Sequence, residues 1–256
     1  MKQYLKTIRR RLVFFGALLA VWQLLCLMKV WPEFLFPAPG SVLESLGSAW
    51  RNGSLPKGIG ASFTRLFIGY FISVAIGLPL GLLTGSVRSL RETVGSILLG
   101  LQTLPSICWL PLALLWFGLN ERAIIFVVVM GAVLSISLAA EDGVRNTPKI
   151  QLRAAKNMGA SGWRLYLQVM LPAALPGIVT GMKLGWSFAW RALMAGELLY
   201  GNIGLGHLLM IGRELNDMAQ VVAVMVVIVV LGLVVDRLLF APLERRVRER
   251  WGTGTL

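Results

Sequence analysis

Six stretches of mostly apolar residues recur along the chain, and each is close to the roughly 20 residues that a helix needs to cross a bilayer. They cover residues 12–30, 61–84, 94–117, 122–140, 173–197 and 218–240. Glycines and prolines interrupt the second and third stretches, so neither of these spans need be straight. The pattern predicts an all-α membrane protein with about six transmembrane helices.

Little of the chain lies outside these stretches. We expect a basic N-terminus at residues 1–11, a single transmembrane domain at 12–240 and a basic tail at 241–256. Residues 32–41 contain three prolines and cannot form a continuous helix, whereas Val42 to Trp50 has the spacing of a short amphipathic helix. A signal peptide is the alternative for the first stretch, but that run is too long and no Ala-x-Ala pattern follows it.

The composition agrees with a membrane protein, because 56% of the residues are hydrophobic and only 14% are charged. The net charge of +13 would also suit a nucleic-acid partner, but the positions of the basic residues argue against one. With both termini in the cytoplasm, 17 lysines and arginines fall on the cytoplasmic side and four on the other. This asymmetry predicts the orientation and attributes the charge to membrane topology.

The longest cytoplasmic loop, residues 141–172, has good helix signals. Thr147 is a plausible N-cap, Pro148 suits the first helical position, and Gly159 can end a helix of about ten residues. An apolar face of Ile150, Ala154, Ala155 and Met158 opposes a basic face of Lys149, Arg153 and Lys156. Ser161 can cap a second short helix that runs to Pro172.

A helix this short needs a surface to dock on. Lipid headgroups are one candidate, with the basic face drawn to anionic lipid and the apolar face inserted. A groove in another protein is the second candidate. The paired alanines Ala154 and Ala155 favour the groove, because small residues let a helix lie deep in protein whereas lipid insertion favours bulky apolar groups.

The loop resembles the permease subunits of ATP-binding-cassette importers of type I, and most of the chain shares the resemblance. The matching segments are RAAKNMGAS at 153–161, LPAALPGIVTG at 171–181, FPAPGSV at 36–42, SFTR at 62–65, GLPLG at 77–81, PLALLWFGLN at 111–120, AWRALMAGE at 189–197 and GLG at 204–206. As an ordered set they are most similar to the nitrate, sulfonate, taurine and bicarbonate branch.

The resemblance implies a multi-pass protein of the bacterial inner membrane whose loop between spans four and five is a coupling helix. That helix would dock on a separate ATPase subunit through Ala154, Ala155, Gly159, Ala160 and Ser161. The family usually has a glutamate where this chain has Arg153, so Arg153 implies an acidic or rearranged contact on the ATPase. The other implied partners are a second permease copy and a periplasmic or lipid-anchored solute-binding protein.

The energy source and any catalytic site lie outside this sequence. No phosphate-binding Gly-x-x-x-x-Gly-Lys-Ser/Thr loop occurs, so we expect ATP and magnesium to be bound by the partner and no cofactor to be bound here. Cys26 and Cys108 fall inside predicted spans and suggest neither a disulfide framework nor a metal site. His207 has no partner discernible from sequence, so no catalytic residue is predicted and the chain is not expected to be an enzyme.

The fifth stretch has two distinct faces. Small residues recur every fourth position at Ala173, Gly177, Gly181, Gly185 and Ala189, which predicts close packing against another helix. A second face carries Lys183, Trp190, Met194 and Glu197, with Arg191 at its margin, and its cationic groups suggest a translocation path for a small anion. Alternatively, these charges pair within the bundle, and Lys183 snorkels or pairs with another span.

Glu197 and the glycine-rich turn at 201–206 are further candidates for the outer gate, which would receive the binding protein. Two other functional classes remain as alternatives. A channel or a carrier driven by an ion gradient would need an ion relay inside the bundle, and Glu197 is the only acid deep enough to consider. An intramembrane enzyme ranks last, since no Ser/His, paired-Asp or metal-ligand set is present.

Overall fold

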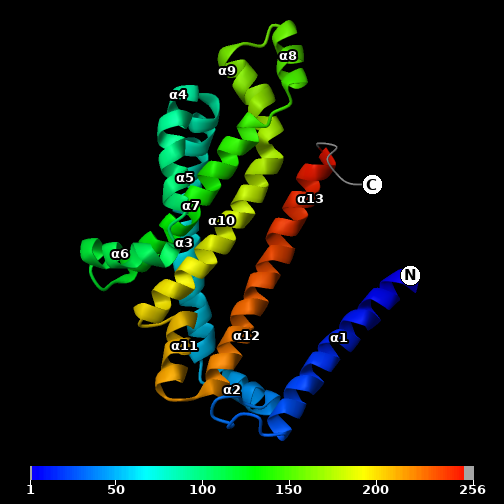
Figure 1. Ribbon diagram of the computed structural model, residues 1–256, viewed down its shortest axis with the longest axis vertical. Helices are drawn as coiled ribbons and strands as arrows, with labels where there is room; N and C mark the ends of the chain where they lie inside the picture. Colours follow the sequence, from blue (N-terminus) through cyan, green and yellow to red (C-terminus); the bar gives the residue numbers. More distant parts are fainter. Residues whose placement is uncertain (1, 251–256) are drawn as a thin grey trace.

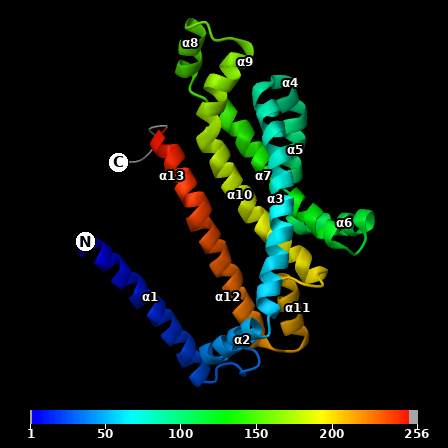
Figure 2. The same ribbon diagram turned by 180° about the vertical axis from the view of Figure 1, so that it is seen from behind.

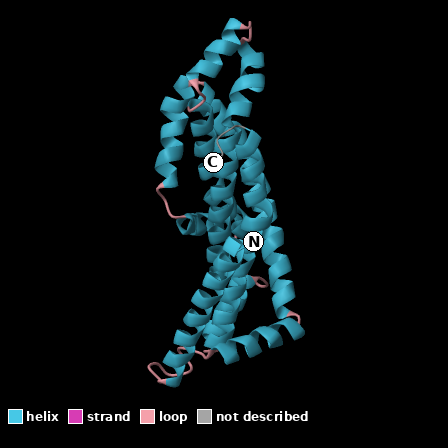
Figure 3. Ribbon diagram, turned by 90° about the vertical axis from the view of Figure 1, so that its right-hand side faces the viewer, coloured by secondary structure: helices cyan, strands magenta, loops and turns pink. Residues whose placement is uncertain are grey.

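The computed structural model describes residues 2–250, and the regular secondary structure in that range is helical. Figure 3 shows helices joined by short loops, and residues 2–250 contain no strand. Four helices are long and apolar enough to cross a membrane. They are α3 (Ser54–Ser86), α7 (Glu121–Arg145), α10 (Leu171–Leu199) with the turn before it, and α12 (Met218–Val235) with its continuation. These four correspond to the second, fourth, fifth and sixth predicted spans.

The third predicted span is not a single straight helix. It consists of two helical segments that meet at an angle of 102°. The first segment, Arg88–Gln102, contains α4 (Arg88–Leu90), η1 (Arg91–Gly95) and α5 (Ser96–Gln102). The second, Ser106–Phe117, contains η2 (Ser106–Trp109) and α6 (Leu110–Phe117). The break falls at Pro105, whose extended backbone (φ −55°, ψ 138°) and missing N–H cannot continue a helix. Figure 1 shows α6 projecting sideways from the bundle. The pair therefore resembles a broken span or a re-entrant segment.

The first predicted span also differs from its expected bounds. Helix α1 (Lys2–Leu27) ends three residues before the predicted limit, and its apolar part is the shorter run Leu12–Leu27. Lys29, just beyond it, has a positive φ of 51° and so cannot extend the helix. The structure gives four spans, or five if the bent pair counts as one, and the exact number of crossings remains a prediction.

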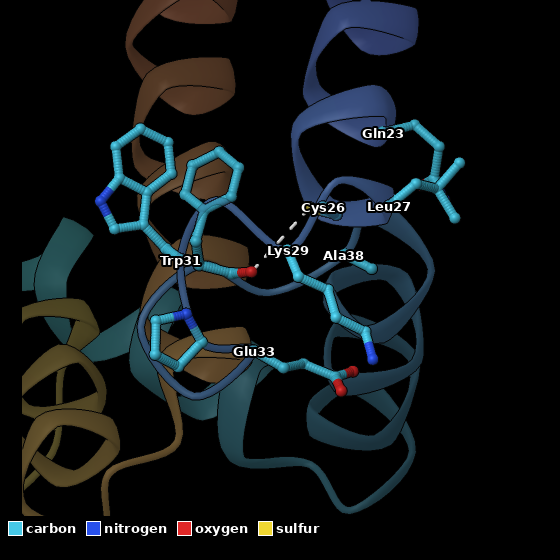
Figure 4. Close-up of a pocket in the computed structure, with 9 residues that line it drawn as sticks. Gln23, Cys26, Leu27, Lys29, Trp31, Glu33 and Ala38 are labelled. Atoms are coloured by element: carbon cyan, nitrogen blue, oxygen red, sulfur yellow. Dashed lines mark hydrogen bonds between the residues drawn. The ribbon is translucent and has the colours of Figure 1, made fainter.

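Helix α1 stands apart from the bundle. Figures 1 and 2 show it connected only at its C-terminal end, through α2 (Pro39–Arg51). At that junction the indole Nε1 of Trp22 donates to the carbonyl of Pro37 at 3.1 Å. Figure 4 shows the adjoining pocket, where the Cys26 thiol contacts the carbonyl of Phe36 at 3.9 Å. Apolar side chains such as Leu12, Phe14 and Leu24 are more than half exposed, as befits a helix in contact with lipid.

Helix α7 lies at the core of the bundle, where it packs between α3 and α10. Glycines on α3 and α10 allow these helices to approach α7 closely. A Cβ added to Gly181 of α10 would lie 2.1 Å from Ala139 Cβ on α7. A Cβ added to Gly81 of α3 would lie 2.0 Å from the carbonyl oxygen of Ser137 on the other side of α7. The predicted stripe of small residues on the fifth stretch is therefore a packing surface, as expected.

The remaining elements lie at the two ends of the bundle. Helix α8 (Lys149–Asn157), α9 (Gly162–Leu165) and the π-helical turn η3 (Tyr166–Met170) form a hairpin that leads into α10. Figure 1 shows this hairpin at one extreme of the molecule and α11 (Leu205–Glu214) with α2 at the other. Helix α12 continues through η4 (Asp236–Phe240) into α13 (Ala241–Arg250), which runs back toward the hairpin end.

Candidate functional site

The ends of α8 are set by local backbone chemistry, though not quite as predicted. Pro148 itself is the N-cap residue, with extended backbone (φ −56°, ψ 125°), so the expectation that Thr147 caps the helix is wrong. Thr147 is 5% exposed instead, and its Oγ1 has no hydrogen-bond partner in the described part of the chain. Proline can begin a helix here because its missing N–H is not needed in the first turn.

Gly159 ends α8 as expected. Its φ of +86° is left-handed, and its N–H donates to the carbonyl of Lys156 at 3.0 Å. The N–H of Ala160 donates to the carbonyl of Ala155 at 2.9 Å, which completes a Schellman motif. A residue with a Cβ would be strained at position 159. Gly159 and Ala160 therefore fix the angle at which the chain turns from α8 into α9.

The predicted apolar face of α8 splits into two. Ala155 is 3% exposed and packs on its own chain, where α8 adjoins η3 and α9. Ile150 and Met158 are 77% and 82% exposed, and Ala154 between them is exposed as well. Ala155 therefore anchors α8, and the outward apolar stripe consists of Ile150, Ala154 and Met158.

Basic side chains flank this outward stripe. Lys149, Arg153 and Lys156 are exposed, and so is Ser161, which directly precedes α9. The sequence contains no aspartate or glutamate from residue 143 to residue 196, so the hairpin cannot neutralise its own charge. The apolar stripe and the surplus of positive charge together give a surface suited to an apolar groove with acidic edges.

Lys183 is paired inside the chain. Its Nζ lies 2.9 Å from Asp236 Oδ1 on η4 and 3.8 Å from Glu244 Oε2 on α13. The pair therefore ties α10 to the last helix of the chain. This geometry corresponds to the structural alternative, in which Lys183 pairs with another span rather than standing free beside a path.

Glu197 is fully buried, with 0% exposure, and is the best-satisfied carboxylate in the described residues. Ser62 Oγ lies 2.9 and 2.8 Å from its two oxygens, Arg65 Nη1 donates to Oε1 at 2.8 Å, and the N–H of Gly206 donates to Oε2 at 3.0 Å. Arg65 Nη1 also donates to the carbonyl of Ile203 at 2.5 Å. This network, which we call the Glu197 cluster, joins α3, α10 and the turn before α11.

The Glu197 cluster extends to a surface residue and depends on two glycines. Arg65 Nη2 contacts Glu121 Oε1 at 2.7 Å, and the side chain of Glu121 is 71% exposed. A Cβ added at Gly204 or Gly206 would lie 2.5 Å from an atom of Glu197. Sequence reasoning placed Glu197 with this turn but missed Ser62, Arg65 and Glu121. The SFTR segment was the available signal, because an arginine in a span usually has an acidic partner.

Trp190 and Met194 lie within the packed bundle. Both adjoin the apolar cluster of Leu55, Leu205, Leu208 and Val224, and the Trp190 ring is 5.6 Å from that of Phe63. The face that carries Trp190, Met194 and Glu197 is therefore covered by α3, α11 and α12. The expectation that this face borders a path is not supported by its burial.

Arg191 is the one predicted path residue whose side chain stays exposed without an acidic partner in the described residues. Its Nε donates to the carbonyl of Ser187 at 3.2 Å, and its guanidinium carbon lies 4.5 Å from the centroid of the Phe188 ring. The cation–π contact holds the charge against α10. The open polar face of α10 is thus the one with Ser187, Phe188 and Arg191.

Comparison with known proteins relates this chain to a family of transport proteins. Residues 77–249 match the model of the family described as binding-protein-dependent transport system inner membrane component. The nitrate import permease protein NrtB of Synechocystis is 29% identical over 243 residues, which cover 91% of this chain and 87% of that protein. The taurine transport system permease protein TauC of Escherichia coli is 29% identical over 237 residues, covering 91% and 86%.

A solved structure shares the fold. A chain of the MetNI methionine ABC transporter in an inward-facing conformation superposes with a TM-score of 0.65 at 24% sequence identity. The match covers 78% of this chain and 97% of that chain. The all-helical type I importer architecture expected from the sequence is therefore confirmed, and so is the nitrate and taurine branch to which the motifs pointed.

Proposed function

Because the chain belongs to the family of inner membrane components of binding-protein-dependent transport systems, we propose that two copies of it form the path of an ATP-driven importer. A separate ATPase supplies the energy, and a solute-binding protein delivers the cargo from outside. Both termini lie in the cytoplasm, in keeping with the 17 to four division of basic residues between the two sides.

The α8–α9 hairpin is the observation that carries this proposal. It projects from one end of the bundle with Ile150, Ala154 and Met158 exposed, and three basic residues flank this stripe. Apolar side chains so exposed beyond a membrane bundle indicate a partner that covers them. The ATPase docks there, and the Schellman motif at Gly159 together with the anchor at Ala155 transmits its movement to α10.

The opposite end of the bundle receives the binding protein. The Glu197 cluster holds the turn at 201–206 against α3 at that end, near α2 and α11. A turn held by a buried ion pair moves as a unit with the helices that it joins, which suits an outer gate. ATP binding brings the two hairpins together, and the different affinities of the partners for the two states drive the alternation of access.

The solute is a small oxyanion or organosulfonate. The relatives are named for nitrate and for taurine, and Arg191 supplies an exposed cation on the open face of α10. A cation inside a membrane is costly unless it meets water or an anion. Selection among such anions rests mainly with the binding protein.

Reconstitution with the cognate ATPase and binding protein tests the proposal. Wild-type protein in liposomes should take up a small sulfonate or nitrate only with ATP and the binding protein present. Met158→Asp should abolish co-purification of the ATPase and uptake together, because a charge replaces an apolar contact. Arg164→Gln, at an exposed residue outside the apolar stripe of the same hairpin, is the matched control. Uptake driven by an ion gradient without ATP would instead support a secondary carrier.

A further inference from the structure

A polar groove lies between α5, α7 and α10, on the same side of the bundle as the open face of α10. Its volume is about 460 Å³, which is within the range of small-molecule sites. Leu99, Leu138, Leu184 and Phe188 form apolar parts of its wall. The polar side chains that line it are Arg91, Ser96, Gln102, Ser135, Glu141, Asp142 and Arg145.

Glu141 is the unusual member of this groove. The residue is 6% exposed, and its buried Oε2 has no hydrogen-bond partner in the described residues. Gly95 makes room for the carboxylate, because a Cβ added there would lie 3.1 Å from that oxygen. The side chain is therefore held against a glycine of η1 with its acceptor unfilled.

The comparison with Glu197 shows how much Glu141 lacks. Glu197 is more deeply buried still, but it receives donors from Ser62, Arg65 and Gly206. A buried carboxylate without such donors is strongly disfavoured unless a cation or N–H donor joins it. Glu141 is thus positioned for a donor that is not part of its own chain.

Hydrogen-bond donors, both basic and neutral, line the same groove. Arg91 forms no ion pair in the described residues, and Arg145 lies 3.9 Å from the exposed Asp142, at the limit for an ion pair. Gln102 Nε2 and Ser135 Oγ are 3.5 Å apart, which leaves most of their hydrogen-bonding capacity unused. Two carboxylates, two guanidinium groups, an amide and two hydroxyls therefore line one groove.

We propose that this groove is a solute-binding site in the path and that it takes a small zwitterion, a molecule with both an ammonium and an oxyanion group. Glu141 accepts hydrogen bonds from the ammonium, Arg91 and Arg145 attract the oxyanion, and Gln102 with Ser135 contacts the solute between them. The inference rests on the proposed importer function and deepens it, since it adds a selective contact within the permease to the selection made by the binding protein. Glu141 lies near the cytoplasmic end of α7, where the solute would leave the path.

A pair of probes that differ in one group tests this assignment. Taurine carries an ammonium group that ethanesulfonate, of nearly the same size, lacks. Glu141→Gln should lower ATP-driven uptake of taurine relative to ethanesulfonate by roughly 10- to 100-fold, the typical loss of a charge-assisted hydrogen bond. Glu92→Gln is the matched control, because Glu92 is an exposed acid at the same end of the bundle and pairs with Arg88 outside the groove. An unchanged ratio between the two probes would overturn the proposal.

A second measurement needs neither the ATPase nor the Glu141 variant. In a chain with Cys26 and Cys108 replaced by serine, Gln102→Cys should react with a charged thiol reagent, and taurine should slow that reaction while ethanesulfonate should not. Ile97→Cys, at an exposed apolar position of the same helix, should react slowly throughout. Equal protection by both probes, or none, would overturn the site. Absence of ATP-driven uptake by the wild type would instead refute the importer function.

Discussion

The Glu197 cluster makes a quantitative prediction about stability. Arg65→Met keeps the length and apolar stem of the side chain but removes the cation that contacts Glu197 at 2.8 Å. Both side chains are almost fully buried, at 5% and 0% exposure, so the carboxylate would be left uncompensated. Breaking such a pair costs about 3–5 kcal/mol. Arg65→Met should therefore lower the melting temperature of the purified protein by about 6–20 °C, at about 2–4 °C per kcal/mol for a chain of this size.

Two further variants separate the buried contact from the exposed one. Glu121→Gln removes an acidic partner that lies at a similar distance from Arg65 but whose side chain is 71% exposed. This variant should lower the free energy of unfolding by less than about 1 kcal/mol. The double variant Arg65→Met with Glu197→Gln removes both buried charges and should be more stable than Arg65→Met alone. Thermal unfolding in detergent, followed by intrinsic fluorescence, measures all four proteins. A double variant no more stable than Arg65→Met alone would refute the assignment of this contact as a buried ion pair.

Three other predictions address the packing, the hairpin and the path. Gly181→Ala should destabilise the protein by about 1–3 kcal/mol through overpacking, whereas Gly100→Ala, where an added Cβ meets nothing within 4 Å, should be neutral or stabilising in thermal unfolding. An acidic contact on the ATPase predicts that Arg153→Glu weakens co-purification of the ATPase and that rising salt weakens the wild-type complex. A wild-type complex whose stability does not change with salt would contradict this. Arg191→Gln should lower uptake of a small anion while leaving thermal stability unchanged, whereas Lys183→Gln should lower the melting temperature slightly and leave uptake intact.

The spans were predictable because hydropathy is summed along the chain and needs no knowledge of neighbours. The glycine stripe on α10 was predictable for the same reason, since a repeat of four residues specifies one helix face. The break at Pro105 was not. Proline inside a span can kink a helix or end it, and the outcome depends on whether neighbouring groups satisfy the freed backbone. The 102° bend is therefore a tertiary result.

In the α8–α9 hairpin, the sequence pattern could not predict which edge of the apolar face is buried. At about 100° per residue, Ile150, Ala154 and Met158 lie within roughly 80° of one another around α8, whereas Ala155 lies a further 60° round. Periodicity alone grouped all four as one apolar face. The structure packs the sector of Ala155 against its own chain and leaves the other three exposed. Which edge of an amphipathic helix faces inward is decided by the angle at which η3 and Gly159 hold it, and no pattern within α8 specifies that angle.

The two buried glutamates show why intramembrane charge alone is a poor guide to a functional site. Glu197 is a candidate from the sequence because it is an acid at the end of a span, yet its side-chain donors, Ser62 and Arg65, lie more than 130 positions away in the sequence. No local rule could have paired them. No sequence signal marks Glu141, because it falls where the fourth span meets the cytoplasmic loop and acids are common there. The decisive difference between them is the number of donors around each carboxylate, which only the assembled helices reveal. Within residues 2–250 the buried Oε2 of Glu141 has no hydrogen-bond partner, and this is the difference on which the proposed solute site depends.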